Sequence, residues 1–132
     1  MNFGIYNAKD CVIEIGGVHI TGLAEDFWSF EKREALSEES VGAQGDVVSS
    51  IKNDPIWDAT VTVQATSPQA NYLLGLMKAT KPFPIWCTNK SLGRKEGGTM
   101  AIMSEAPSDE LGAAVGDLEF KFSVLDGDII TD

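Results

Sequence analysis

Short runs in which apolar and polar residues alternate constrain the fold of this chain more than any other feature of its sequence. The clearest run is WDATVTVQA, residues 57–65, in which every second residue is apolar. Successive side chains of a β-strand point to opposite faces, so this pattern predicts a strand with one buried face. A second run, LEFKFSVL, points Leu118, Phe120, Phe122 and Val124 to one face and Glu119, Lys121 and Ser123 to the other.

A β-hairpin is predicted near the start of the chain, in CVIEIGGVHITG. Two glycines between β-rich runs are typical of a tight two-residue hairpin turn. The turn then fixes the pairing, with Ile15 facing Val18, Glu14 facing His19 and Ile13 facing Ile20. We expect the four apolar residues to share the core face, with Glu14 and His19 opposite each other on the other face.

The rest of the chain adds further strands and one helix. FWSFEKREA, VVSSI, FPIWCTN and TMAIMSEA read as strands, and SLGRKEGG reads as a turn-rich loop. A helix is expected from Ser67 as N-cap, through an apolar stripe of Leu73, Leu76 and Met77, to Pro82. The chain of 132 residues is therefore expected to form a single domain, residues 1–132, of the mainly β class. We predict a β-sandwich or barrel with one flanking α-helix.

Charge excludes several kinds of partner. The formal net charge is −10, which argues against tight nucleic-acid binding and against anionic membranes. No apolar run approaches the ~20 residues that span a bilayer, and no signal peptide is recognisable, so folding in a cytoplasm is expected. Residues 59–95 hold no acid and five bases, Lys78, Lys81, Lys90, Arg94 and Lys95. These bases are a candidate interface patch for an acidic surface on a neighbouring copy, or else part of a mixed solvated surface.

Residues suited to catalysis or metal binding are few. His19 is the one histidine, and its expected position opposite Glu14 favours a structural role. No His or Cys pair has zinc-site spacing, and Asp126-Gly127-Asp128 is typical of a turn. We therefore predict no catalytic residues, no metal, no cofactor and no enzymatic activity.

The cysteines and tryptophans each allow two interpretations. Cys11 and Cys87 form no CxxC motif, so two reduced, buried thiols are expected, with a disulfide as the alternative. Trp28, Trp57 and Trp86 lie in or beside β-rich runs. We expect them to pack in the core, with a ligand cage or stacking platform as the alternative.

One stretch fits neither strand nor helix well. Residues 37–55, SEESVGAQGDVVSSIKNDP, are polar, acidic at the start and interrupted by Gly42 and Gly45. Long irregular segments in small domains are usually functional or disordered. The stretch is either a mobile surface loop or an extended arm loop that orders on contact with another molecule.

Three motifs in order resemble a known family. They are the hairpin exit at residues 17–22, the VGAQG segment at residues 41–45 and the strand-to-helix junction at residues 60–68. Together they resemble the tail-tube proteins of contractile-tailed bacteriophages, over roughly residues 10 to 125. The approach to the third motif, DPIW at residues 54–57, is less polar than the family pattern.

The resemblance implies a structural subunit. Copies would form a hexameric ring whose inner strands join into one continuous barrel, and rings would stack into a hollow tube. DNA would pass through the lumen without specific binding, and the partners would be sheath and baseplate or terminator proteins. The location implied is the tail of a virion assembled in the host cytoplasm.

The resemblance also suggests roles for particular residues. The arm that contacts neighbouring subunits or rings would include Glu38, Glu39, Val41, Gly42, Gln44, Gly45 and Asp46. An acidic lumen would repel phosphate, and its candidate residues are Ser29, Glu31, Arg33, Ser50 and Lys52. Asp58, Thr60, Thr62 and Gln64 compete for the same role. The alternative functions are a tail terminator, a baseplate-side tube component, or a monomeric ligand-binding β-barrel.

Overall fold

The computed structural model describes residues 3–78 and 81–131 of the chain. This part of the chain is mainly β with one short α-helix, so the predicted fold class is confirmed. The strands are β1 (Cys11–Ile15), β2 (Val18–Ile20), β3 (Leu23–Lys32), β4 (Ser37–Val41), β5 (Val47–Ile51), β6 (Trp57–Gln64), β7 (Phe83–Asn89), β8 (Arg94–Glu105), β9 (Asp117–Val124) and β10 (Asp128–Thr131). The helical elements are the 3-10 turn η1 (Ala8–Asp10), α1 (Ala70–Gly75) and the 3-10 turn η2 (Leu76–Lys78).

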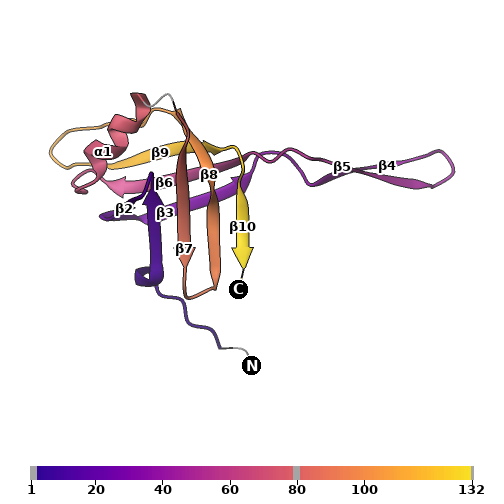
Figure 1. The fold of residues 1–132 in the computed structure, drawn as a ribbon, viewed down its shortest axis with the longest axis horizontal. Coiled ribbons are helices and arrows are strands. Elements are labelled where there is room, and N and C mark those ends of the chain that lie inside the picture. Colours follow the sequence, from indigo (N-terminus) through magenta and orange to yellow (C-terminus); the bar gives the residue numbers. More distant parts are fainter. Residues whose placement is uncertain (1–2, 79–80, 132) are drawn as a thin grey trace.

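An open antiparallel sheet folds over itself to enclose the core. Its strand order is β2-β1-β7-β8-β9-β6-β3, and β10 pairs with β8 off this path. β8 belongs to both halves of the sheet, because residues 94–98 pair with β7 and residues 101–105 pair with β9. In Figure 1, β1, β7, β8 and β10 accordingly run across β3, β6 and β9, and the two halves form the layers of a sandwich.

A bulge in β8 lies where the sheet passes from one layer to the other. Phe83 pairs with Ala101 and Ile85 pairs with Gly98, so β8 holds an extra residue between these pairs. Bulges bend a strand and increase its twist. The adjacent Gly97 has φ 140°, and a Cβ there would lie 2.0 Å from the carbonyl oxygen of Ile85. Only glycine therefore fits at this close approach of β7 and β8.

Asp126 caps this bulge from the turn between β9 and β10. Its carboxylate accepts hydrogen bonds from the backbone N–H groups of Thr99 and Met100, both at 3.0 Å, and the Thr99 hydroxyl also donates to it. Burial acts to raise the pKa of Asp126, but these hydrogen bonds outweigh it, and the pKa lies below its usual value. Asp126 thus accepts hydrogen bonds from backbone N–H groups that the bulge takes out of the regular pairing between strands.

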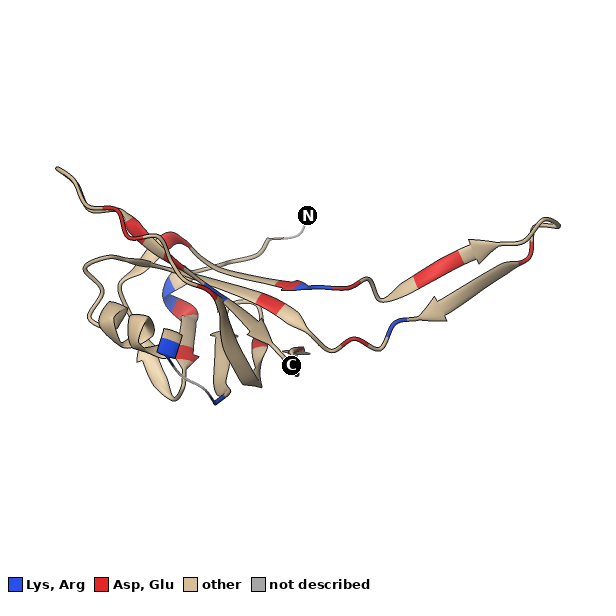
Figure 2. Ribbon diagram, turned by 90° about the horizontal axis from the view of Figure 1, so that it is seen from above, with Lys and Arg blue, Asp and Glu red and all other residues tan. Residues whose placement is uncertain are grey.

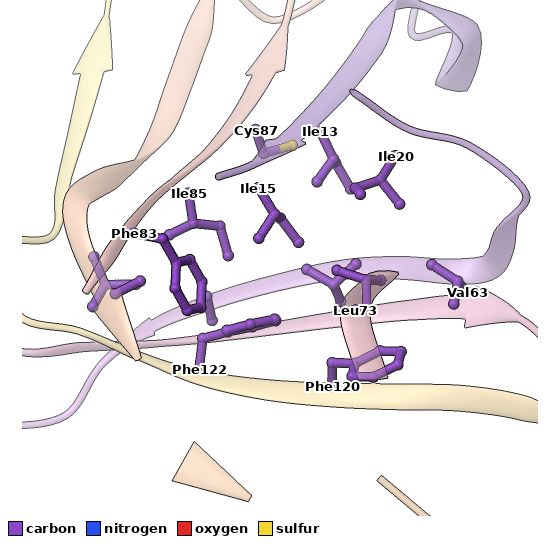
Figure 3. Close-up of a cluster of buried hydrophobic side chains, with 14 of the residues drawn as sticks. Ile13, Ile15, Ile20, Val63, Leu73, Phe83, Ile85, Cys87, Phe120 and Phe122 are labelled. Carbon is purple, nitrogen blue, oxygen red and sulfur yellow. The ribbon is translucent and has the colours of Figure 1, made fainter. Parts of the chain in front are cut away.

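The core lies between the two layers, where the apolar faces of the alternating runs meet (Figure 3). The hairpin register predicted across Gly16-Gly17 is confirmed. Phe83 and Phe122, from opposite layers, meet edge to face with ring centroids 5.8 Å apart. The residues expected from alternation to face the core include these fully or almost fully buried ones: Ile13, Ile15, Ile20, Ala59, Val61, Val63, Leu118, Phe120, Phe122 and Val124.

The helix is shorter than predicted and begins differently. The N-cap is Gln69 and not Ser67. The buried Ser67 hydroxyl accepts from the backbone N–H of Gln69 at 3.3 Å and donates to the carbonyl of Thr21. Gln69 precedes α1, and its side-chain oxygen accepts from the backbone N–H of Thr21 at 2.9 Å. These contacts tie the helix to the end of the first hairpin. Leu73 is fully buried as predicted, but Met77 is 43% exposed and does not belong to the buried stripe.

Two segments near the C-terminal half also differ from expectation. The predicted loop at residues 91–98 is only a short turn, since β8 already begins at Arg94. The acidic tail contains an unpredicted strand, β10, which pairs with residues 94–97 of β8. Trp28 and Trp57 pack against the core as expected, whereas Trp86 pairs with Glu14 and Gly97 and lies beneath the Lys95 ammonium at 4.5 Å.

Removing the carboxylate of Asp126 should destabilise the fold. We expect Asp126→Ala to lower the free energy of unfolding by about 1–2 kcal/mol at pH 7, because the bulge amides lose their acceptor. Because the folded-state pKa is lowered, this contribution is present above about pH 4 and is lost as pH falls through the folded value. Urea unfolding at pH 7 and pH 3 measures both effects.

The exposed Asp128→Ala variant is the matched control, and it should change stability by less than about 0.5 kcal/mol. Equal losses in the two variants, or a loss in Asp126→Ala that does not change with pH, would contradict the capping role.

Candidate assembly surfaces

Residues 37–55 form a β-hairpin rather than an irregular loop. β4 and β5 pair from Ser37 opposite Ile51 to Val41 opposite Val47. Gly45 closes the turn with φ 90°, and its N–H donates to the carbonyl of Gly42 at 3.0 Å. We call residues 36–52 the arm. All the arm residues named from the sequence lie in it and are exposed: Glu38, Glu39, Val41, Gly42, Gln44, Gly45 and Asp46.

The arm projects from the sandwich without support from it (Figure 1). It continues the direction of β3 and β6, and its reach from Arg33 to Gly42 is about 30 Å at the usual rise of a strand. Val41, Val47 and Ile51 share one face of the arm and are 69%, 64% and 76% exposed. An isolated two-stranded hairpin is at best marginally stable in water. The arm therefore has open edges and apolar side chains that a further surface could cover.

Members of the two residue sets that compete for the lumen share one face of the sheet. Ser29 pairs with Thr60 and Glu31 pairs with Asp58, so their side chains lie on the same side. This surface continues onto β9. We call it the polar face, and it comprises Ser29, Glu31, Asp58, Thr60, Thr62, Gln64, Asp117, Glu119 and Lys121, with Arg33 and Glu105 at its margin.

Two of the residues named for the lumen lie elsewhere. Ser50 is in β5, and Lys52 directly follows it. Both belong to the arm, where the Lys52 ammonium lies 3.1 Å from the carboxylate of Glu38. The structure therefore brings Ser29, Glu31 and Arg33 together but does not place Ser50 and Lys52 with them.

The bases of the polar face are neutralised by neighbouring acids. The Arg33 guanidinium donates to Asp58 at 2.7 Å and to Ser123 at 2.8 Å. The hydrogen bond and the charge of Asp58 raise the pKa of Arg33 further. Lys121 lies 3.4 Å from Glu105 and 3.9 Å from Glu119. Acids outnumber bases along these strands and on the arm, as Figure 2 shows.

The five bases predicted as one patch are divided between two places. Lys78 and Lys81 lie beside the start of β7, whereas Lys90, Arg94 and Lys95 lie at its far end. β7 has seven residues, so the two groups are about 20 Å apart. The five bases therefore do not form one continuous patch on a single copy, because β7 separates the two groups, and their role at an interface stays a prediction.

A cavity that sequence reasoning did not find opens between the layers beside β3. It has a volume of about 220 Å³ and is lined by Tyr6, Cys11, Glu25, Asp26, Phe27, Trp28, Cys87, Asn89 and Glu96. The indole N–H of Trp28 is buried and has no hydrogen-bond partner among the described residues. Burial raises the pKa of Glu96. His19 lies outside this cavity and faces Glu14 on the exposed side of the first hairpin.

Other sites for chemistry are not evident in the described part of the chain. Residues 3–78 and 81–131 contain no group of three His, Cys, Asp or Glu side chains placed to hold a metal ion. The same residues include no helix long and apolar enough to cross a membrane.

Comparison with known proteins identifies a shared fold. No protein-family model and no curated protein matches the sequence. One similar solved structure is the tube-terminating cap of the anti-feeding prophage, with a TM-score of 0.65 and 11% identity over 100% of this chain and 95% of that chain. Another is the sheath/tube terminator of PVC, an extracellular contractile injection system, in its extended state. Its TM-score is 0.66, with 10% identity over 98% of this chain and 99% of that chain.

A third similar structure is the PVC sheath-tube complex in its extended state. It has a TM-score of 0.62 and 9% identity, over 97% of this chain and 93% of that chain. Identities this low establish the fold alone. The chain therefore has a fold found in the tube and terminator assemblies of contractile injection systems.

The two thiols should be unreactive in the folded protein. Cys11 and Cys87 are both free and buried, and burial raises the pKa of Cys87 to about 12. Thiolate is the reactive form, so we expect neither thiol to react rapidly with Ellman's reagent at pH 8. Both should react once the protein is unfolded in guanidinium. Rapid labelling of the folded protein, or fewer than two thiols after unfolding, would contradict this description.

Proposed function

We propose that this protein is a ring-forming structural component of the tube of a contractile phage tail or phage-like injection particle. The observation that carries the proposal is the exposed arm, which packs on no other segment of the described residues. A heterologous contact between the arm and the next copy would generate a closed ring. The shared fold supports this role, since the similar structures come from assemblies of that kind.

The comparisons favour a component at the end of the tube over the subunit that repeats along it. Two of the similar structures reported above are described as a tube-terminating cap and a sheath/tube terminator, which supports a terminator role. The main tube subunit is the second candidate, and the likeness to the sheath-tube complex supports it. In both cases the partners are further copies of this chain together with tube, sheath or baseplate proteins, and the location is the tail of an extracellular particle.

The polar face is the surface we assign to the lumen. It carries Glu31, Asp58, Glu105, Asp117 and Glu119 against only Arg33 and Lys121, and both bases are ion-paired. A channel with this excess of carboxylates repels phosphate, so DNA would pass without being bound. The ion pair between Arg33 and Asp58 also explains how an arginine can lie in an acidic channel.

The arm replacement tests the proposed function. Leu36 and Lys52 oppose each other, because the Lys52 N–H donates to the Leu36 carbonyl at 2.9 Å. Replacing residues 37–51 with Asn-Gly should therefore close a short hairpin and leave the sandwich intact. We expect the melting temperature to change by less than about 3 °C, since the arm makes no core contact, while the protein remains monomeric.

Sedimentation velocity over a range of concentrations gives the readout for this variant and for the wild type. A single wild-type species of ring mass would support the terminator role, and species that grow with concentration would support the tube subunit. Assembly of the arm-replaced variant, or a wild type that stays monomeric at every concentration, would overturn the proposal.

Charge reversal on the polar face tests its assignment to the lumen. The Glu31→Lys/Glu119→Lys variant should assemble as the wild type does but should bind short double-stranded DNA in a salt-dependent way. We expect the wild-type assembly to leave the DNA free in fluorescence anisotropy at about 0.1 M salt, where the Debye length is about 10 Å. Glu14→Lys/Glu110→Lys, at exposed positions outside the polar face, is the control for net charge. DNA binding to that control and not to the polar-face variant would contradict the assignment.

A further inference from the structure

One end of the sandwich collects bases that form no ion pair with the acids of the described residues. The Lys90 N–H donates to the Asp10 carbonyl at 3.3 Å, which joins η1 to the turn between β7 and β8. The Ser91 hydroxyl donates to the Asp10 carboxylate at 2.8 Å. These contacts bring Lys9 beside the turn that carries the other bases of this end. We call Lys9, Lys90, Arg94 and Lys95 the basic end.

The basic end differs from the other cationic sites of the molecule. Arg33, Lys52 and Lys121 each form an ion pair within 3.9 Å of a carboxylate. Across residues 3–78 and 81–131, no member of the basic end forms such a pair. Of the nearby acids, Asp10 is held by Ser91, Glu96 is partly buried, and Asp128 lies further along β10, opposite Gly97. Among the described residues, this end thus has four bases against three acids, a small positive excess in a protein of net charge −10.

The arm carries the complementary charge. It contains Glu38, Glu39 and Asp46 and the single base Lys52, which is paired with Glu38. Glu39 and Asp46 are exposed and have no basic partner among the described residues. Opposite charges on two separate surfaces of one chain favour head-to-tail contact between copies and disfavour a symmetric contact of like surfaces.

An open strand edge lies beside the basic end. β10 pairs only with β8, and its Ile129 and Ile130 are 37% and 48% exposed. Ile130 pairs with Lys95 and Thr131 pairs with Arg94, so the two bases lie on opposite faces of the sheet and flank the edge. An exposed edge of this kind is a template for pairing with another strand. The arm has open edges of its own, so the surface offers it backbone partners, apolar contacts and cations.

From this complementarity we infer that the basic end and the β10 edge are the docking surface for the arm of a second copy. The inference rests on the proposed function, because it names the surface that the arm contacts. Glu39 and Asp46 of the arm pair with bases of the basic end, and the aliphatic residues of the arm cover Ile129 and Ile130.

A charge exchange tests the docking. Lys90→Glu/Arg94→Glu should raise the protein concentration needed for half-assembly about tenfold or more, because like charges then face each other. Combining it with Glu39→Lys/Asp46→Lys should bring that concentration back to within about threefold of the wild type. Lys78→Glu/Lys81→Glu makes the same change in net charge at the other end of β7 and should assemble as the wild type does.

Sedimentation velocity measures assembly, and thermal melting confirms that each variant is folded. The inference is overturned if Lys90→Glu/Arg94→Glu assembles normally, or if it fails to assemble and the arm exchange does not restore it. The second result would direct attention to another acidic surface, such as residues 105–117. Either result leaves the proposed function standing provided that the wild type assembles and the arm-replaced protein does not. A wild type that never assembles overturns both.

Discussion

The fold depends on β8, the one strand that belongs to both layers. Its bulge beyond Gly98, capped by Asp126, lets a single sheet turn over and enclose its own core. Because the layers cross, β3 and β6 run out of the sandwich together and continue into the arm (Figure 1). The same crossing gives the molecule two separate solvent faces, and acids outnumber bases on the polar face of β3, β6 and β9. The bend in β8 thus determines where the surfaces relevant to assembly lie.

The arm is the part of the chain whose conformation is not explained by packing against the core. Each of its open edges presents backbone groups to water, and its valines and Ile51 are largely exposed. Covering such side chains is worth about 25 cal/mol per Å² of apolar surface, so contact with another molecule would stabilise the hairpin. Electrostatics adds selectivity: the acidic arm is repelled by the polar face and attracted by the basic end. These considerations favour head-to-tail association of copies.

Local patterns in the sequence predicted the local structure well, but they did not predict contacts between residues that are distant in the sequence. The two-residue turn at Gly16-Gly17 fixes its register, so Glu14 opposite His19 could be predicted. The sequence wrongly indicated Ser67 as the helix cap, because the hydrogen bond from its hydroxyl to Thr21 joins residues that are remote in the sequence. β10 is short and exposed and has no alternating pattern. Glu31 and Asp58 come from two alternative sets of lumen candidates, and their pairing shows that both lie on one face. The length of β7 separates bases that are close in the sequence and were predicted to form one patch.

Negative-stain electron microscopy of the purified wild-type protein, over a range of concentrations, tests the central claim most directly. The account predicts ring-shaped particles with a central hole: isolated rings of uniform height for a terminator, or rings stacked into hollow filaments for a tube subunit. Particles of monomer size at every concentration would contradict it, and the arm would then be an exposed hairpin of a monomeric β-sandwich.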